Sequence, residues 1–155
     1  MGSWNTLATF YQLSSPLRHI KADVSLVSSS PSGSGGAFGV RTHTTNSPIE
    51  VVYVDSPVDS VLKFDAVSTN ARVHAALHRA YEGTFALATS NAGAVVDRLR
   101  DVEDPSGQGR KRRVTRRSVE RSHVFGEVEW VPSSDSNEAG SVNIVTTNSG
   151  VTLTV

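Results

Sequence analysis

Apolar and polar residues alternate in four segments of the chain, each built around an asparagine. The segments are residues 40–51, 64–75, 85–96 and 142–153. Six positions before the asparagine the residue is apolar in every segment, and two positions before it stands threonine or serine. Alternation with a period of two is typical of a half-buried β-strand. Each segment is therefore predicted to begin with a strand whose even offsets from the asparagine face inward.

The inward positions change parity at the asparagine of each segment. Beyond it, the apolar residues occupy odd offsets, three and five positions later. A straight strand cannot change which side chains face inward, so the chain must bend or gain a residue there. Asparagine followed by a small residue suits such a bend, because asparagine tolerates left-handed backbone and bonds to nearby backbone groups. Each segment is predicted as strand, corner and strand, and the structural corner residues are Asn46, Asn70, Asn91 and Asn148.

The spacing of the four asparagines is 24, 21 and 57 residues. The first two values suit stacked coils, in which equivalent asparagines form a ladder and each coil buries its face against its neighbours. We predict an all-β single domain, residues 1–155, folded as a short β-solenoid of about five coils. The long gap leaves room for a degenerate coil, with residues 124–130 as its strand. The alternative is a β-sandwich, which also has short strands joined by Ser, Thr and Asn turns.

Both ends of the chain require separate interpretations. Within residues 1–26, a roughly helical spacing relates Trp4, Leu7, Phe10, Tyr11 and Leu13. We expect a partly helical N-terminal cap, followed by a strand near Ile20, because an open solenoid end exposes strand edges. The apolar segment 151–155 is expected to be an exposed edge or to be covered by a partner. Self-association through such an edge is one of the partner hypotheses.

Composition narrows the classes of protein that fit. A length of 155 residues suits one domain, and the absence of cysteine excludes disulfides and thiolate chemistry. The 15 basic and 15 acidic residues cancel, so net charge directs the chain toward neither nucleic acid nor an anionic membrane. No apolar run is long enough to form a transmembrane segment, and we find no signal peptide or Asn-x-Ser/Thr sequon. These features favour a cytoplasmic location.

A charged excursion, residues 97–123, interrupts the repeat. Its segment 110–121 contains seven basic residues, which are Arg110, Lys111, Arg112, Arg113, Arg116, Arg117 and Arg121. Such a run is a candidate anion or nucleic-acid site, or a nuclear-import signal. The competing interpretation is a long hairpin with a charged, solvated edge. We favour the hairpin and disfavour nucleic acid as a partner, because no aromatic residues interleave the run for base stacking.

The sequence contains no pattern that predicts a catalytic, metal or cofactor site. His74 and His78 are four residues apart, but in a strand that spacing separates side chains by roughly 13 Å. A glycan-acting enzyme remains the alternative function, because paired carboxylates perform acid–base work on glycosidic bonds. The carboxylates that could serve are Asp55, Asp59, Glu127 and Glu129.

The four segments THTTNSPIEV, AVSTNARVHA, ALATSNAGAVV and IVTTNSGVTL resemble an uncharacterised fungal, mostly basidiomycete, family of adhesin-like β-solenoid domains. The stretches AYEGTFALATSNA and DPSGQGRKRRV, the latter followed by GEVEW, add to the resemblance, which covers about residues 38–155. The resemblance implies a β-solenoid and places the basic run in an excursion, but it supplies no active site. The leading hypothesis is a non-enzymatic structural or adhesin-like module that presents a repetitive β-face to a protein or glycan.

Overall fold

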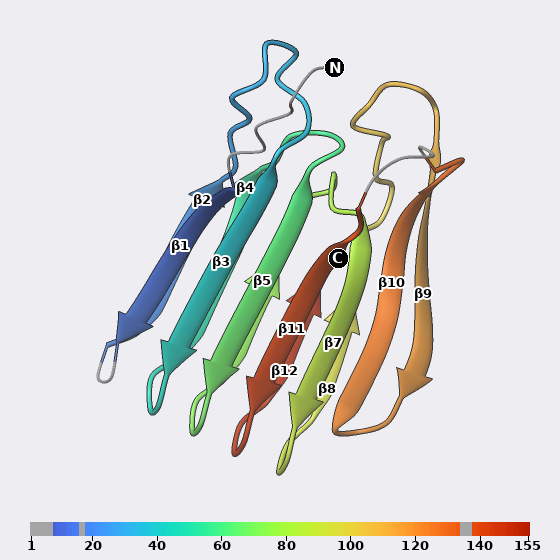
Figure 1. The fold of residues 1–155 in the computed structure, drawn as a ribbon. Helices are drawn as coiled ribbons and strands as arrows, with labels where there is room; N and C mark the ends of the chain where they lie inside the picture. The colour runs from blue at the N-terminus through green and yellow to red at the C-terminus, as the bar shows by residue number, and fades with distance from the viewer. Residues whose placement is uncertain (1–7, 16–17, 134–137) are drawn as a thin grey trace.

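The computed structural model describes residues 8–15, 18–133 and 138–155. Within these residues the chain forms β-strands and no helix, and hence no helix that could span a membrane. Every strand belongs to a seven-stranded or a five-stranded sheet (Figure 1). The prediction of an all-β protein is therefore confirmed.

The seven-stranded sheet has the order β1-β3-β5-β11-β7-β10-β9, and the five-stranded sheet has the order β2-β4-β6-β12-β8. The larger sheet contains β1 (Ala8–Ser15), β3 (Ala37–Thr44), β5 (Val61–Ser68), β11 (Gly140–Thr146), β7 (Gly83–Thr89), β10 (His123–Val131) and β9 (Lys111–Val119). The smaller sheet contains β2 (Ile20–Ser25), β4 (Ile49–Asp55), β6 (Val73–Ala76), β12 (Val151–Thr154) and β8 (Ala94–Asp97). Neighbours run parallel except at β10, which is antiparallel to both β7 and β9.

Successive strands form pairs that cross from the larger to the smaller sheet at a corner (Figure 1). Four pairs, β3–β4, β5–β6, β7–β8 and β11–β12, coincide with the four repeats found in the sequence. Equivalent residues are hydrogen-bonded neighbours, so that Phe64 pairs with both Val40 and Val142. The predicted strand–corner–strand units are therefore confirmed.

The parity switch places both strands of a pair against one core. In the first repeat Val40, Thr42 and Thr44 are buried before the corner, and Ile49 and Val51 are buried after it. The buried hydroxyl of Thr44 donates a 2.6 Å hydrogen bond to the carbonyl of Ser47. The recurring threonine thus satisfies a corner carbonyl that would otherwise lack a partner inside the protein.

The four corner asparagines form a continuous ladder on the surface. Asn70 donates its amide to Asn46 Oδ1 at 2.6 Å, and Asn148 donates to Asn70 Oδ1 at 2.7 Å. Asn91 completes the ladder by donating to Asn148 Oδ1 at 2.7 Å. The order of the ladder follows the sheet rather than the chain.

The pair β11–β12 lies between β5–β6 and β7–β8, although it follows both in the chain. Its entry brings Gly140 beside Gly83, where a Cβ on Gly83 would lie 2.2 Å from the Gly140 carbonyl oxygen. Glycine is therefore required for this approach. The expectation that segment 151–155 forms an edge or is covered by a partner is wrong for β12, because that strand is flanked by β6 and β8.

Two further predictions differ from the structure. Residues 124–130 form a strand as predicted, but β10 has no corner and forms an antiparallel hairpin with β9 instead of a coil. At the N-terminus, Tyr11 and Leu13 lie in β1 rather than in a helix, because β1 pairs in register with β3. A helical spacing of so few residues does not outweigh that pairing. Trp4 and Leu7 lie outside the described residues, and the strand expected near Ile20 is β2.

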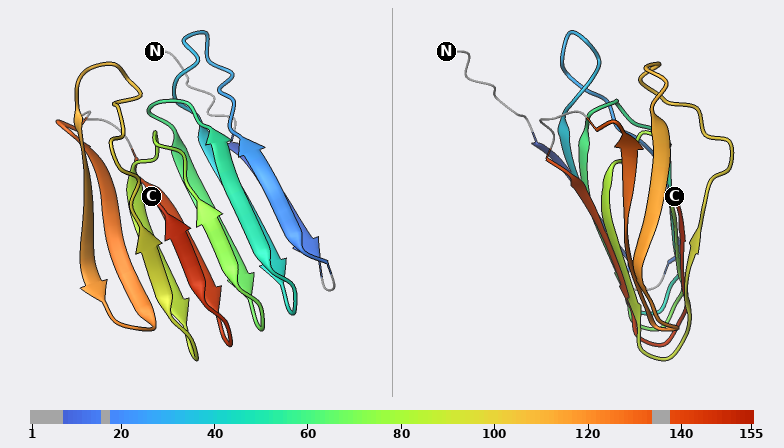
Figure 2. Two further views of the ribbon diagram at one scale, coloured as in Figure 1. Left: turned by 180° about the vertical axis from the view of Figure 1, so that it is seen from behind. Right: turned by 90° about the vertical axis from the view of Figure 1, so that its right-hand side faces the viewer.

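The two sheets approach each other at the corners and diverge toward the opposite ends of the strands (Figure 2). One side of the stack is closed by the β9–β10 hairpin, from which Val114 packs against the core. On the other side, β1 and β2 are the edges of their sheets. The two sides of the molecule are therefore built differently.

The ladder predicts a graded loss of stability. Asn70→Ala removes two amide contacts and Asn46→Ala removes one, and a typical hydrogen bond contributes about 1 kcal/mol. We expect Asn70→Ala to lower the free energy of unfolding by about 1–2 kcal/mol and Asn46→Ala by about half as much. Urea unfolding measures the free energy of unfolding of each variant. Equal losses in the two variants would contradict the idea that each amide contact of the ladder adds its own stabilisation.

Candidate functional site

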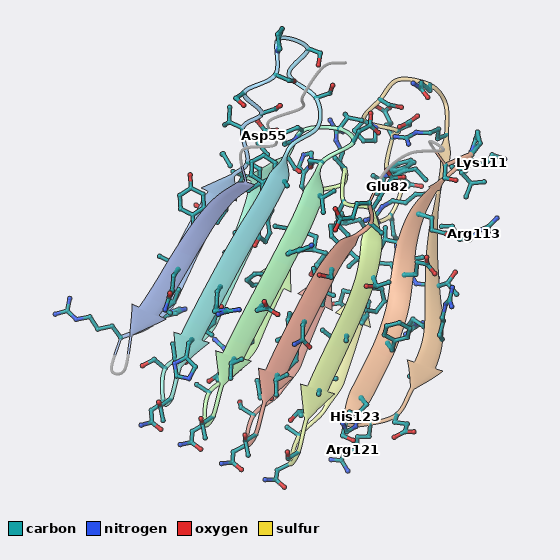
Figure 3. All side chains as sticks on the ribbon, viewed as in Figure 1. Asp55, Glu82, Lys111, Arg113, Arg121 and His123 are labelled. Carbon is teal, nitrogen blue, oxygen red and sulfur yellow. The ribbon has the colours of Figure 1, made fainter. Side chains whose placement is uncertain are left out.

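The predicted basic run does not form one patch. Figure 3 shows Lys111 and Arg113 near the upper end of β9, whereas Arg121 lies beside His123 at the lower end of the hairpin. Most of the run is in β9, the edge strand of the larger sheet. The hairpin interpretation of this segment agrees with its position.

Two of the arginines on β9 are paired with carboxylates of β10. Arg117 Nη2 lies 2.6 Å from Glu127 Oε2, and Arg113 Nη1 lies 3.8 Å from Glu129 Oε2. Both arginines are largely exposed, so these pairs add little stability. They do reduce the positive charge that the strand presents to an anion.

Arg110 is buried in a charged cluster at the start of the hairpin. Its side chain is 5% exposed and its Nη2 lies 3.2 Å from Asp104 Oδ1, whose side chain is 4% exposed. Arg110 Nη1 also lies 3.5 Å from Glu82 Oε1, and the guanidinium stands 5.8 Å from the ring centre of Trp130. Glu82 Oε1 accepts a 3.0 Å hydrogen bond from the Trp130 backbone N–H. The cluster thus connects the 104–110 loop to β10 and to the residue before β7.

Asp104 organises the loop that carries Arg110. Its carboxylate accepts hydrogen bonds from the backbone N–H groups of Ser106, Gln108 and Arg110, at 2.9–3.1 Å. Burial acts to raise the pKa of this carboxyl, but the backbone and side-chain donors of Arg110 and Ser106 outweigh it and hold the pKa well below its usual range. Asp104 is therefore an ionised structural anchor.

Arg112 differs from the other cations of the run. Its Nε and Nη2 atoms are buried and have no hydrogen-bond partner among the described residues. Burial lowers the pKa of its guanidinium. A charge that is desolvated without a partner opposes folding.

The cluster around Arg110 was not predicted from the sequence. The separation Asp104-x-Ser106 near a Pro and a Gly is typical of a turn in which an Asp side chain binds backbone, and this local signal was available. No local sequence signal marks Glu82 or Trp130, because these residues come close to Arg110 only through the pairing of β7 with β10. Arg110 itself is therefore a structural residue rather than an exposed anion ligand.

The candidate catalytic carboxylates converge only in part, because Glu127 and Glu129 line one hollow whereas Asp55 and Asp59 lie elsewhere. Asp55 ends β4 in the smaller sheet, whereas Glu127 and Glu129 lie on β10 of the larger sheet and are paired with arginines. Figure 3 shows Asp55 at one side of the molecule, far along the sheet from the β9–β10 hairpin. Asp59 is exposed in the turn that follows β4. Glu127 and Glu129 are each paired with an arginine, whereas an acid–base pair needs one carboxyl that can hold a proton.

The predicted histidines also remain separate. His74 lies on β6, and His78 follows that strand and accepts a 3.2 Å hydrogen bond at Nδ1 from the Ala80 N–H. Burial is the main cause that lowers the pKa of His78. Within the described residues, no group of three or more His, Asp or Glu side chains is placed to hold a metal ion.

The outer face of the larger sheet carries a row of aligned side chains, which we call the outer row. Strand register places its members next to one another across six strands, in the order Gln12, Arg41, Asp65, Asn143, Ala86 and Phe125. Arg41 and Asp65 form an ion pair at 3.8 Å, and Phe125 is 40% exposed. The outer row therefore has planar polar side chains at one end and an exposed aromatic ring at the other.

A hollow of about 600 Å³ lies at the polar end of the outer row. Gly39 lies among its lining residues, together with Gln12, Arg41, Lys63 and Asp65. A glycine in a strand often marks a place where a ligand or another chain comes close to the backbone. The side chains around this hollow supply both hydrogen-bond donors and acceptors.

Comparison with protein-family models, with curated proteins and with solved structures gives no significant match to this chain.

The buried Arg110 and the half-buried Arg112 should respond oppositely to a neutral side chain of similar length. Arg110→Met leaves Asp104 and Glu82 without their cation, so we expect a loss of about 3–5 kcal/mol in the free energy of unfolding. Arg112→Met removes a guanidinium whose buried Nε and Nη2 have no hydrogen-bond partner among the described residues, and we expect stability to be unchanged or raised by about 1 kcal/mol. Chemical denaturation of both variants tests this, and a similar loss in both would contradict it.

Asp104 predicts a specific acid dependence. Because its pKa is lower in the folded than in the unfolded state, its contribution is complete above the unfolded value of about 3.9 and is lost as pH falls through the folded value. Asp104→Asn should therefore be less stable than the parent at neutral pH, and the difference should shrink below about pH 4. Urea unfolding from neutral to acid pH measures the difference, with the exposed Asp59→Asn as the matched control. A difference that is constant with pH would contradict the assignment.

Proposed function

We propose that this chain is a short β-solenoid that works as a non-enzymatic binding module and uses the outer row of its larger sheet to bind a glycan. The observation that carries the proposal is the alignment of Gln12, Arg41, Asp65 and Asn143 with the exposed ring of Phe125 across neighbouring strands. Membership of the adhesin-like family that the sequence resembles is part of the same proposal.

The solenoid description is supported by the way the strand pairs stack. In-register parallel neighbours recur from β1 to β7 in the larger sheet and throughout the smaller one. β-Sandwiches are built mainly from antiparallel strands, and their sequences need no position-by-position repeat. The corner ladder gives each pair the same height as its neighbours, which suits a stack of equivalent units.

A glycan fits the outer row better than a compact small molecule does. Strands lie about 4.8 Å apart, so a row of six strands extends roughly 24 Å, which is the length of an oligosaccharide rather than of one sugar. Sugar hydroxyls both donate and accept hydrogen bonds, as do the amides of Gln12 and Asn143 together with the Arg41–Asp65 pair. Phe125 adds an apolar surface on which a sugar ring can pack.

The other two functions have weaker support. Nucleic-acid binding needs cations that are free to approach phosphates, whereas Arg110, Arg113 and Arg117 are each paired with carboxylates. An acid–base enzyme needs carboxylates that face one substrate. Here Asp55 and Asp59 lie apart from Glu127 and Glu129, which line one hollow but are each paired with an arginine.

The proposal predicts that binding depends on the outer row. On a glycan array, the wild-type chain should bind at least one class of oligosaccharide. Asp65→Ala and Asn143→Ala should each weaken that binding tenfold or more, which corresponds to about 1.4 kcal/mol. Both side chains point away from the core, so the variants should remain folded.

The matched control is Thr152→Ala, which changes the outer face of the smaller sheet and should leave affinity unchanged. A wild-type chain that binds no glycan, or glycan binding that survives both outer-row substitutions, would contradict the proposal. If the chain instead binds a protein, and if Asp65→Ala and Asn143→Ala abolish that binding, the ligand of the outer row is a protein and not a glycan.

A further inference from the structure

The two side edges of the larger sheet differ in charge. The edge strand β9 contains Lys111 and four arginines, whereas the edge strand β1 has the sequence ATFYQLSS, without a charged residue. Charged side chains on an edge strand oppose the addition of another strand, and an uncharged edge permits it. Strand addition is therefore resisted at β9 and open at β1.

The core is uncovered beside β1. Tyr11 pairs in register with Val40, and Leu13 with Thr42, so both side chains lie in inward rows. Tyr11 is 55% exposed and Leu13 is 37% exposed, whereas Val40 and Thr42 are at most 3% exposed. Apolar side chains that face inward and still meet solvent mark a surface that association would cover.

The edge strand of the smaller sheet, β2, lies on the same side of the stack. Its outward side chains are Lys21 and Asp23, with Ala22 between them on the inward face. Lys21 lies 3.3 Å from Glu50, and Asp23 forms no ion pair with the described residues. The β1–β2 side therefore offers two sheet edges, exposed inward-facing side chains, and a carboxylate, Asp23, that has no counter-ion in the described part of the chain.

We propose that the β1–β2 side is the interface of a homodimer, in which two copies meet across a two-fold axis that is perpendicular to the smaller sheet at β2. This rotation reverses the direction of β2 and keeps it in the smaller sheet, so that β2 is extended by β2 of the second copy as an antiparallel pair. The two sheets diverge away from the corners, so β1 is not extended in the same way. Its inward-facing Tyr11 and Leu13 are instead covered where the two copies meet.

The charges of β2 select the register of this pairing. With the axis at Ala22, Lys21 lies opposite Asp23 of the second copy, and the symmetry makes the same contact twice. An axis at Lys21 or at Asp23 would place like charges opposite each other, which is unfavourable. Ala22 is therefore the residue that meets its own counterpart.

The absence of cysteine from the chain allows a direct test. Ala22→Cys should form a disulfide-linked dimer under mild oxidation, or be linked by a short bifunctional maleimide, because the two substituted residues face each other across the axis. The matched control is Thr115→Cys on β9, which should remain unlinked under the same conditions. Equal linking of both variants, or no linking of Ala22→Cys, would overturn the proposed register.

Sedimentation equilibrium tests the interface without a cross-link. The wild-type chain should be a dimer at ~100 µM, a concentration at which even weak association is populated. Leu13→Lys should raise the dissociation constant tenfold or more by adding a charge to the β1 edge, while Thr115→Lys on β9 should leave it unchanged. Circular dichroism checks that both variants keep their strands. A monomeric wild type, or a dimer that Leu13→Lys leaves intact, would overturn the proposal, and neither result depends on whether the outer row binds a glycan.

Discussion

The contact between equivalent corners is the interaction on which the rest of the structure depends. The asparagine amides bond from one corner to the next, and the hydroxyl of Thr44 holds the corner carbonyl of Ser47 from inside. Together they fix the height of each strand pair relative to its neighbours. Because the heights agree, inward rows align into one core and outward side chains align into rows across the sheet. A register error of one residue would turn those rows inside out.

Much of the fold followed from the sequence, because the period-two alternation and the parity switch at Asn46, Asn70, Asn91 and Asn148 are properties of each unit alone. The order of the units did not. Phe64, Val142 and Phe85 occupy the same row, so the alternation cannot tell which pair lies beside which. The pair β1–β2 was interpreted as a cap because its sequence lacks the corner asparagine pattern. Its place in the stack is set by pairing with β3 and β4.

The candidate site was less predictable than the fold. The basic run was visible in the sequence, but whether an arginine is exposed, paired or buried depends on residues that are distant along the chain. Arg110 finds Glu82 through the pairing of β7 with β10, and Arg113 finds Glu129 across the hairpin. Charges in this segment mainly fasten a loop and protect an edge. The outer row was also invisible, because its residues come from six strands and become neighbours only in register.

The pair β11–β12 lies between strands that precede it in the chain, and this position constrains folding during synthesis. During synthesis β5 and β7 leave the ribosome well before residues 140–154, so the place between them must stay vacant or be closed by direct contact of the two strands. Both strands carry the same inward rows, which makes that direct contact a credible competitor. If β5 and β7 have already paired with each other, β11–β12 can enter the sheet only by separating those two strands. The larger sheet can therefore reach its final strand order only after residues 140–146 have been synthesised.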